Sequence, residues 1–187
     1  MIFLTDQLFF DTDCISSFLW TDKGCLLTQL YPKRIVIPKI VLDELSRVHK
    51  PKFTQRLTSL LNSGEARTMD IDYGTEAFSL FRQMTTLPAP GKPAIGNGEA
   101  SALALAKEHS GIIASNNFRD IKFYIRDLEL QYLSTGDILF EAFNDGLLSP
   151  KEAELIWKTM LEEDCWIGAQ SFEEYMNKPY KPLLNNL

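Results

Sequence analysis

The sequence predicts a three-layer α/β/α fold with a mostly parallel central sheet. Short β-rich runs alternate along the chain with amphipathic helical patterns, which is typical of parallel α/β proteins. The chain has 187 residues, enough for one domain of ordinary size with an apolar core. Its 45% hydrophobic and 24% charged residues indicate a globular rather than a disordered protein.

Five short runs are predicted strands because they are apolar or β-branched and lie between turn or helix signals. These runs are 8–10, 34–38, 66–71, 112–115 and 130–133. Pro38 closes the second run, where it cannot donate to a strand ladder but suits the first turn of a following helix.

Helical patterns fill the intervals between the strands. The expected helices are two within 13–31, broken near Lys23–Gly24, then 39–48, 51–64, 75–84, 98–111, 118–128, 135–148 and one from 150 to about 163. Segment 85–98 is a predicted loop because it holds three prolines and three glycines. We expect residues 1–148 to form the main domain and residues 149–187 a C-terminal helical extension packed on it.

Charge and cysteine usage narrow the function classes. The net charge of −6 argues against a non-specific DNA coat, but not against a nuclease, because metal ions can supply positive charge locally. Three widely spaced cysteines without a CxxC pair indicate neither a zinc site nor a disulfide scaffold. No window approaches the ~20 apolar residues of a membrane span. We therefore expect a cytoplasmic protein with no membrane contact.

Carboxylates and amides follow several of the predicted strands. Because ligands of parallel α/β sheets bind beyond the carboxyl ends of the strands, these side chains are expected to meet at one edge. They are Asp11 and Asp13 after 8–10, Glu44 after 34–38, Glu99 at the start of helix 98–111, and Asn116, Asn117 and Asp120 after 112–115. Such an oxygen-rich cluster suits Mg²⁺ or Mn²⁺. A bound ion would polarise a phosphodiester and help to generate hydroxide from water.

The order of these motifs resembles the PIN-domain family of metal-dependent ribonucleases, over roughly residues 7–148. The matching segments are FFDTDC with Asp11, VIPKIVLDEL with Glu44, and GNGEASALALA with Glu99. STGDILFEAFNDGLLS resembles the last helix of one branch of the family. IIASNNFRD matches only in part, because Asn116 and Asn117 stand where the family usually has a fourth acid. An amide carries no negative charge and cannot act as a base.

The resemblance implies a PIN-type endoribonuclease that hydrolyses RNA phosphodiesters with metal-activated water, using Mg²⁺ or Mn²⁺. It makes Asp11, Glu44 and Glu99 the catalytic acids, with Asp11 and Glu99 as direct metal ligands and Glu44 completing or positioning the site. We add Asn117, at the position of the fourth acid, and Asp120, one helical turn further on as its substitute, to the metal set. Asp13 is a further acid that could compensate for Asn117. Many small members are toxins of bacterial toxin–antitoxin pairs, so the implied partners are RNA and an antitoxin protein. The sequence is compatible with a monomer and with a homodimer and does not distinguish between them.

Each of these residues also has an ordinary structural interpretation. Asp11 and Asp13 can cap a helix, and of the two we expect Asp13 to be the cap; Glu99 can stabilise a first turn, and Asn116–Asn117 can form a turn. Glu44 can belong to a solvated helix face. The departure at Asn116–Asn117 supports an alternative, a catalytically weak PIN-like module that binds RNA or protein; a different small phosphohydrolase is a third reading. Basic residues that could contact an RNA backbone, with surface solvation as the default, are Lys33, Arg34, Lys50, Lys52, Arg56, Lys92, Arg119, Lys122 and Arg126.

Overall fold

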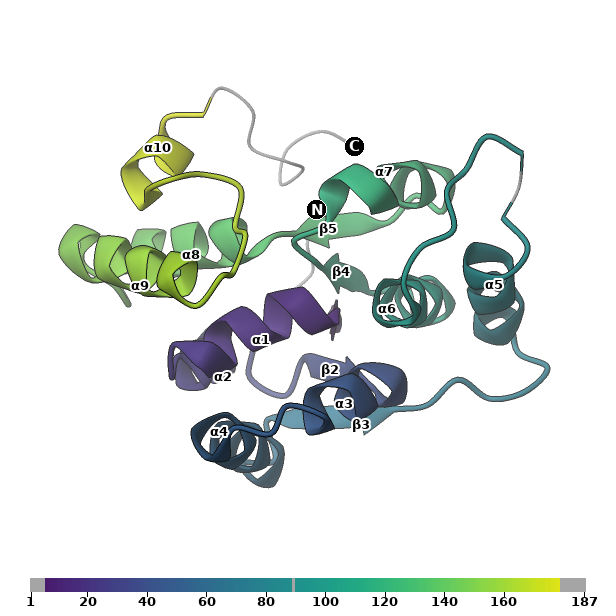
Figure 1. The fold of residues 1–187 in the computed structure, drawn as a ribbon, viewed down its shortest axis with the longest axis horizontal. Coiled ribbons are helices and arrows are strands. Elements are labelled where there is room, and N and C mark those ends of the chain that lie inside the picture. Colours follow the sequence, from purple (N-terminus) through teal and green to yellow (C-terminus); the bar gives the residue numbers. More distant parts are fainter. Residues whose placement is uncertain (1–5, 89, 179–187) are drawn as a thin grey trace.

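The computed structural model describes residues 6–88 and 90–178, and its centre is a five-stranded parallel sheet (Figure 1). The strands are β1 (Leu8–Phe10), β2 (Ile35–Pro38), β3 (Ala66–Met69), β4 (Ile112–Ala114) and β5 (Gln131–Leu133). They are ordered β3-β2-β1-β4-β5, and every neighbouring pair is parallel. The predicted fold class is confirmed.

Strands β1, β2 and β4 are buried along their whole length. Their side chains alternate between two apolar clusters, with Leu8 and Phe10 in one and Phe9 in the other. Helices cover both faces of the sheet, which explains why these strands read as continuous apolar runs instead of alternating with polar residues.

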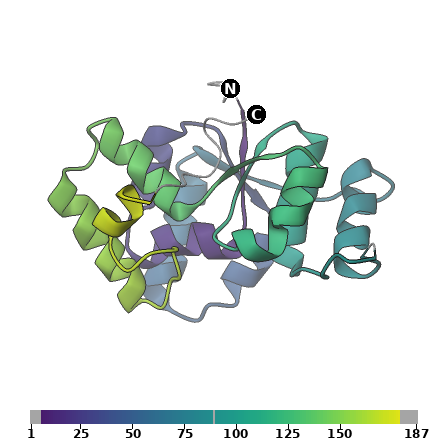
Figure 2. The same ribbon diagram turned by 90° about the horizontal axis from the view of Figure 1, so that it is seen from above.

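The described part of the chain has ten helices arranged in two layers around the sheet (Figure 1). They are α1 (Thr12–Trp20), α2 (Gly24–Leu30), α3 (Lys39–Ser46), α4 (Pro51–Asn62), α5 (Glu76–Thr85), α6 (Asn97–Glu108), α7 (Phe118–Asp127), α8 (Thr135–Asn144), α9 (Pro150–Glu162) and α10 (Phe172–Met176). Helices α5, α6 and α7 pack on the Phe9 face, and the others contribute to the opposite cluster. Figure 2 shows α8–α10 and α5 at opposite sides of the molecule.

Local sequence signals set the ends of several helices. The side chains of Ser134 and Ser149 each form a capping box at the start of α8 and α9. Pro51 occupies the first turn of α4, and Gly64, with a φ of 74°, follows its end. These signals explain why the predicted boundaries lie within a few residues of the observed ones.

The C-terminal helices pack on the same apolar cluster as the sheet. Trp157 of α9 is fully buried, its ring lies against Phe172 and Tyr175, and its Nε1–H donates to the carbonyl of Ala169 (3.1 Å). The chosen boundary at residue 149 stays a prediction. Residues 179–187 of the predicted extension lie outside the described residues. Within the described residues, no helix combines the length and apolarity required to span a bilayer.

Candidate active site

The candidate site lies where the strand order reverses. From β1 the chain proceeds outward through β2 to β3, whereas β4 returns to the other side of β1 and continues to β5. Adjacent loops diverge at such a switch point, which leaves room for a ligand beyond the carboxyl ends of the strands. Asp11 directly follows β1 there, and its N–H donates to the carbonyl of Ala114, the last residue of β4 (2.9 Å).

Asp11 is buried, with 1% of its surface exposed. Its Oδ1 accepts the N–H of Cys14 (2.7 Å) and so caps α1. The expectation that Asp13 is the cap was wrong, because Asp13 lies inside the first turn of the helix. Its Oδ2 is buried and accepts no hydrogen bond within the described residues. Burial raises the pKa of Asp11 to about 8; the Ser115 hydroxyl and the Cys14 amide oppose this rise, while Asp13 and Glu99 add to it. One oxygen therefore caps the helix. The Ser115 hydroxyl favours the ionised form of Asp11, but no described donor forms a hydrogen bond with Oδ2.

Glu44 is held by a residue of the first motif. The Thr12 hydroxyl donates to Oε2 of Glu44, which joins α1 to α3. Gly98 of α6 lies against this pair: a Cβ there would be 2.7 Å from Thr12 Oγ1 and 2.8 Å from Glu44 Oε2. A larger residue at position 98 would therefore displace the Thr12 and Glu44 oxygens from their present positions. Thr12 was missed from the sequence, although it stands inside the quoted FFDTDC motif.

Glu99 lies in the first turn of α6 and is half-buried. Its Oε1 accepts a hydrogen bond from the Nδ2 of Asn117 (3.3 Å), and the backbone N–H of Asn117 donates to Ser115 Oγ (3.1 Å). The structure thus brings Asn117 to Glu99, as the sequence predicted, with the amide nitrogen toward the carboxylate. A Cβ at Gly96 would meet Glu99 Oε2, so a larger residue there would displace the Glu99 carboxylate.

Asp13, Asn116 and Asp120 occupy different positions around this centre. Asp13 lies at the protein surface. Its pKa is raised, first because the surrounding protein atoms displace part of its hydration and then because the negative charges of Glu99 and Glu44 are nearby. Asn116 has a structural role, because its Oδ1 accepts the N–H of Thr135 (3.0 Å). Asp120 is exposed in the first turn of α7, and no contact among the described residues joins its side chain to the other candidate acids.

A divalent cation fits the chemistry of this centre. Asp11, Glu44 and Glu99 offer only oxygen donors, and the orphaned Oδ2 of Asp11 is an atom that a cation would satisfy. Across residues 6–88 and 90–178, however, no three His, Cys, Asp or Glu side chains form a group that could hold a metal ion. The metal set drawn from the sequence therefore stays a prediction.

A cavity of about 400 Å³ lies beside Asp13 and Asn117, and its lining does not include Asp11, Glu44 or Glu99. Asp13 and Asn117 line it from the candidate site, and Trp166, which is 64% exposed, lines it from the segment after α9. The remaining lining residues are Ser16, Ser17, Trp20, Asn116, Glu163, Asp164 and Cys165. The C-terminal extension therefore borders the candidate site.

Sequence reasoning also missed the buried Asp137. Its Oδ2 accepts from the backbone N–H and the hydroxyl of Ser134, and its Oδ1 accepts the hydroxyl of Tyr175 (2.7 Å). The network connects α10 to the start of α8. The S-x-x-D spacing at 134–137 was the available signal, because it is typical of a capping box.

Comparison with known proteins assigns the family. A family model described as a PIN domain matches residues 7–179, which extends the predicted span through α9 and α10. No curated protein matches the chain. PIN domains are generally nucleases and typically use divalent metal ions, so the fold described above is of the nuclease type. The chain belongs to the PIN-domain family.

Proposed function

We propose that this protein is a divalent-metal-dependent endoribonuclease and the toxin of a toxin–antitoxin pair. The observation that carries the nuclease proposal is Asp11, a buried acid with one unpartnered oxygen at the switch point of a nuclease-type sheet. Asp13 and Glu99 interact with it electrostatically. A helix cap needs only one acceptor, so capping accounts for Oδ1 but not for Oδ2.

The neighbouring residues orient the acids for this role. The Cys14 amide fixes Oδ1 of Asp11, the Thr12 hydroxyl fixes one oxygen of Glu44, and Asn117 holds Glu99. We assign Asp11 and Glu99 as ligands of Mg²⁺ or Mn²⁺, with Asn117 and Asp120 as the remaining predicted set and Glu44 completing or positioning the site. When bound, such an ion stabilises charge on the phosphate and makes the attacking water more acidic.

Cleavage of a single-stranded RNA by the purified protein tests this function. Activity should require Mn²⁺ or Mg²⁺, stop on chelation, and fall at least about 100-fold in Asp11→Asn, Glu44→Gln and Glu99→Gln. Asp43→Asn is the matched control, because Asp43 is the exposed neighbour of Glu44 and forms its one ion pair within the described residues with Lys39. Cleavage that survives both the Asp11 and Glu99 substitutions would show that the site is wrongly assigned.

The toxin assignment has its own test, since a nuclease need not be a toxin. Induced expression should arrest growth, Asp11→Asn should not, and co-expression of the protein encoded by the adjacent reading frame should restore growth. Wild-type expression without growth arrest would remove the toxin role and leave the nuclease proposal standing.

Asn117 supports one alternative function: a PIN-like module that binds RNA or protein and cleaves little. Asn117 stands where the family usually offers a fourth acid, and its amide donates to Glu99 instead of adding negative charge. Titration with Mn²⁺ separates the two functions. A protein that binds no Mn²⁺ up to about millimolar concentration cannot run the metal-dependent reaction, whereas tight binding favours the nuclease.

A further inference from the structure

The segment 45–64 is positively charged in an otherwise acidic chain. It holds four of the 19 Lys and Arg residues and none of the 25 Asp and Glu residues, although the net charge of the protein is −6. The four are Arg47, Lys50, Lys52 and Arg56, with His49 between the first two. The segment comprises the end of α3, the following loop and α4.

Three of these cations are free to act on a ligand. Arg47, Lys50 and Lys52 are exposed, and none of them forms an ion pair with another described residue. Arg56 differs, because it pairs with Asp22 (3.1 Å) and donates to two carbonyls at the end of α1. Arg56 therefore anchors α4, and the other three supply uncompensated positive charge.

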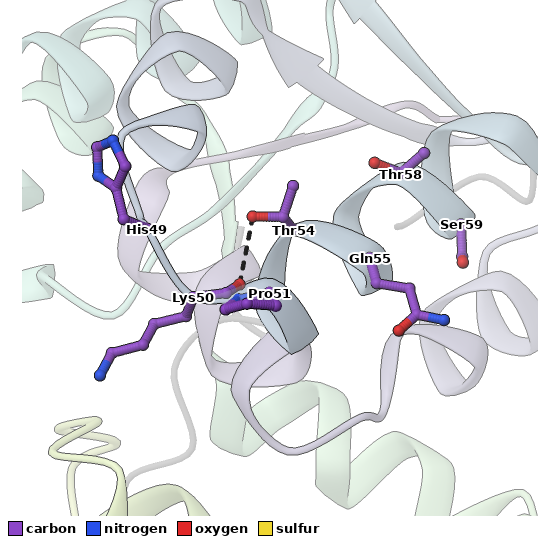
Figure 3. A pocket seen from close by; sticks show the side chains of 7 residues that line it. All are labelled: His49, Lys50, Pro51, Thr54, Gln55, Thr58 and Ser59. Carbon is purple, nitrogen blue, oxygen red and sulfur yellow. Dashed lines mark hydrogen bonds between the residues drawn. The ribbon is translucent and has the colours of Figure 1, made fainter.

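A hollow begins at His49 and Lys50 and continues along α4. It has a volume of about 560 Å³ and is lined by His49, Lys50, Pro51, Thr54, Gln55, Thr58 and Ser59, without any carboxylate (Figure 3). Most of its exposed lining surface is apolar, and Lys50 is the cation at its edge. Figure 3 shows Lys50 extending away from the helix and the Thr54 hydroxyl donating to the Lys50 carbonyl (3.2 Å). A second hollow of about 550 Å³ shares Gln55 and Ser59 and adds Lys52, together with Asp22, whose carboxylate is paired with Arg56. Hydroxyl and amide groups thus accompany the positive charge, as a sugar–phosphate backbone requires.

The cationic segment starts beside the candidate acids. Arg47 caps α3, and its N–H donates to the carbonyl of Glu44 (3.1 Å), so it follows Glu44 by one helical turn. An acidic centre repels the phosphates that flank a scissile bond, and an unpaired cation such as Arg47, one turn from Glu44, offsets that repulsion.

We propose that Arg47, Lys50, Lys52 and the hollow along α4 form a track for the backbone of single-stranded RNA that leads to the candidate site. This inference rests on the proposed ribonuclease function. A narrow line of cations with polar neighbours is the arrangement that follows one strand without reading its bases.

Salt-dependent binding tests the track without any cleavage. The probe is a fluorescent 12-nucleotide oligouridylate, and its anisotropy is measured in EDTA between about 50 and 200 mM NaCl. Each phosphate contact contributes about −0.7 to the slope of log K against log salt for a single strand. Lys50→Gln/Lys52→Gln should therefore flatten the slope by about 1.4 and weaken binding about 25-fold at 0.1 M salt. Lys151→Gln/Lys158→Gln, two exposed positions on α9, is the matched control and should change neither quantity.

The RNA-binding results test the track, and the cleavage results test the proposed ribonuclease function, so either proposal can fail without the other. An unchanged slope in the Lys50/Lys52 variant, an equal loss in the α9 control, or a wild-type protein that binds no oligouridylate would overturn the track. A variant that binds RNA normally but loses a protein partner assigns this face to protein and overturns it as well. Wild-type protein that binds with the predicted slope but never cleaves with Mn²⁺ keeps the track and refutes the nuclease.

Discussion

Asp11→Asn should make the metal-free protein more stable while it removes catalysis. Asn has nearly the shape of Asp and is an equally good N-cap, so its Oδ1 can still accept the Cys14 N–H that begins α1. What the substitution removes is a carboxylate that is 1% exposed and whose Oδ2 has no partner in the described structure. Stability and activity should therefore move in opposite directions.

The pKa of Asp11 determines how much Asp11→Asn should change the free energy of unfolding. Burial raises it from 3.8 to about 8, so at neutral pH the folded protein carries the neutral acid while the unfolded chain carries the ionised one. Taking up that proton on folding near pH 7 costs about 4 kcal/mol, at about 1.4 kcal/mol for each unit between the solution pH and the ordinary pKa. Because the Asn amide must find its own partner, we expect a net gain of about 2–4 kcal/mol.

The sign of the pH dependence follows from the same shift. Between about pH 4 and pH 8 the folded state binds more protons at Asp11 than the unfolded state, so wild-type stability should fall as the pH rises through this window. The difference between wild type and Asp11→Asn isolates this group: it should be small near pH 4 and grow toward pH 8.

Urea unfolding in EDTA at several pH values measures these free energies. Asp11→Ala is the control for the cap, since it removes the charge together with the hydrogen bond to Cys14 and should be about 1 kcal/mol less stable than Asp11→Asn. Equal stability of wild type and Asp11→Asn at pH 7, or a difference that does not change with pH, would refute the reasoning about the buried carboxylate.

Further predictions concern the surroundings of the acids. Gly98→Ala should reduce cleavage at least about 10-fold and cost about 1–3 kcal/mol in urea unfolding, because its Cβ has no room, whereas Gly24→Ala, with its nearest atom at 4.0 Å, should be tolerated in both assays. Thr12→Val should lower the cleavage rate with little change in Tm, since it releases Glu44. Mn²⁺ should raise the Tm of wild type in differential scanning calorimetry, but not that of Asp11→Asn. Tyr175→Phe should cost about 1 kcal/mol in urea unfolding and leave cleavage unchanged, because its hydroxyl serves only the α8–α10 contact.

The fold was largely predictable because its determinants are local. Continuous apolar runs such as 8–10 and 34–38 indicated strands with both faces covered, and serine capping boxes fixed the starts of α8 and α9. Helix α10 was not predicted. At five residues it is too short to show a period, and its position depends on packing against Trp157.

The site was predictable as a set of positions but not as a set of contacts. Topology explains the positions, since residues that follow β1 and β4 meet wherever those strands are neighbours. The contacts depend on side chains far apart in the chain. Thr12 contacts Glu44 beside Gly98, which leaves space for both side chains. No local sequence pattern around Thr12 or Glu44 predicts that a distant glycine lies there.

Asp11 began as an ambiguous residue, and its two oxygens now separate the two interpretations. A cap alone would be served as well by Asn or Ser, without the free-energy cost of a carboxyl group whose pKa is raised to about 8. Groups held in a costly state concentrate at functional sites, where the surrounding fold maintains them. The cap explains why Asp11 lies where β1 becomes α1. The unpartnered Oδ2 requires another explanation, and a cation shared with Glu99 supplies one that also offsets the repulsion between the two carboxylates.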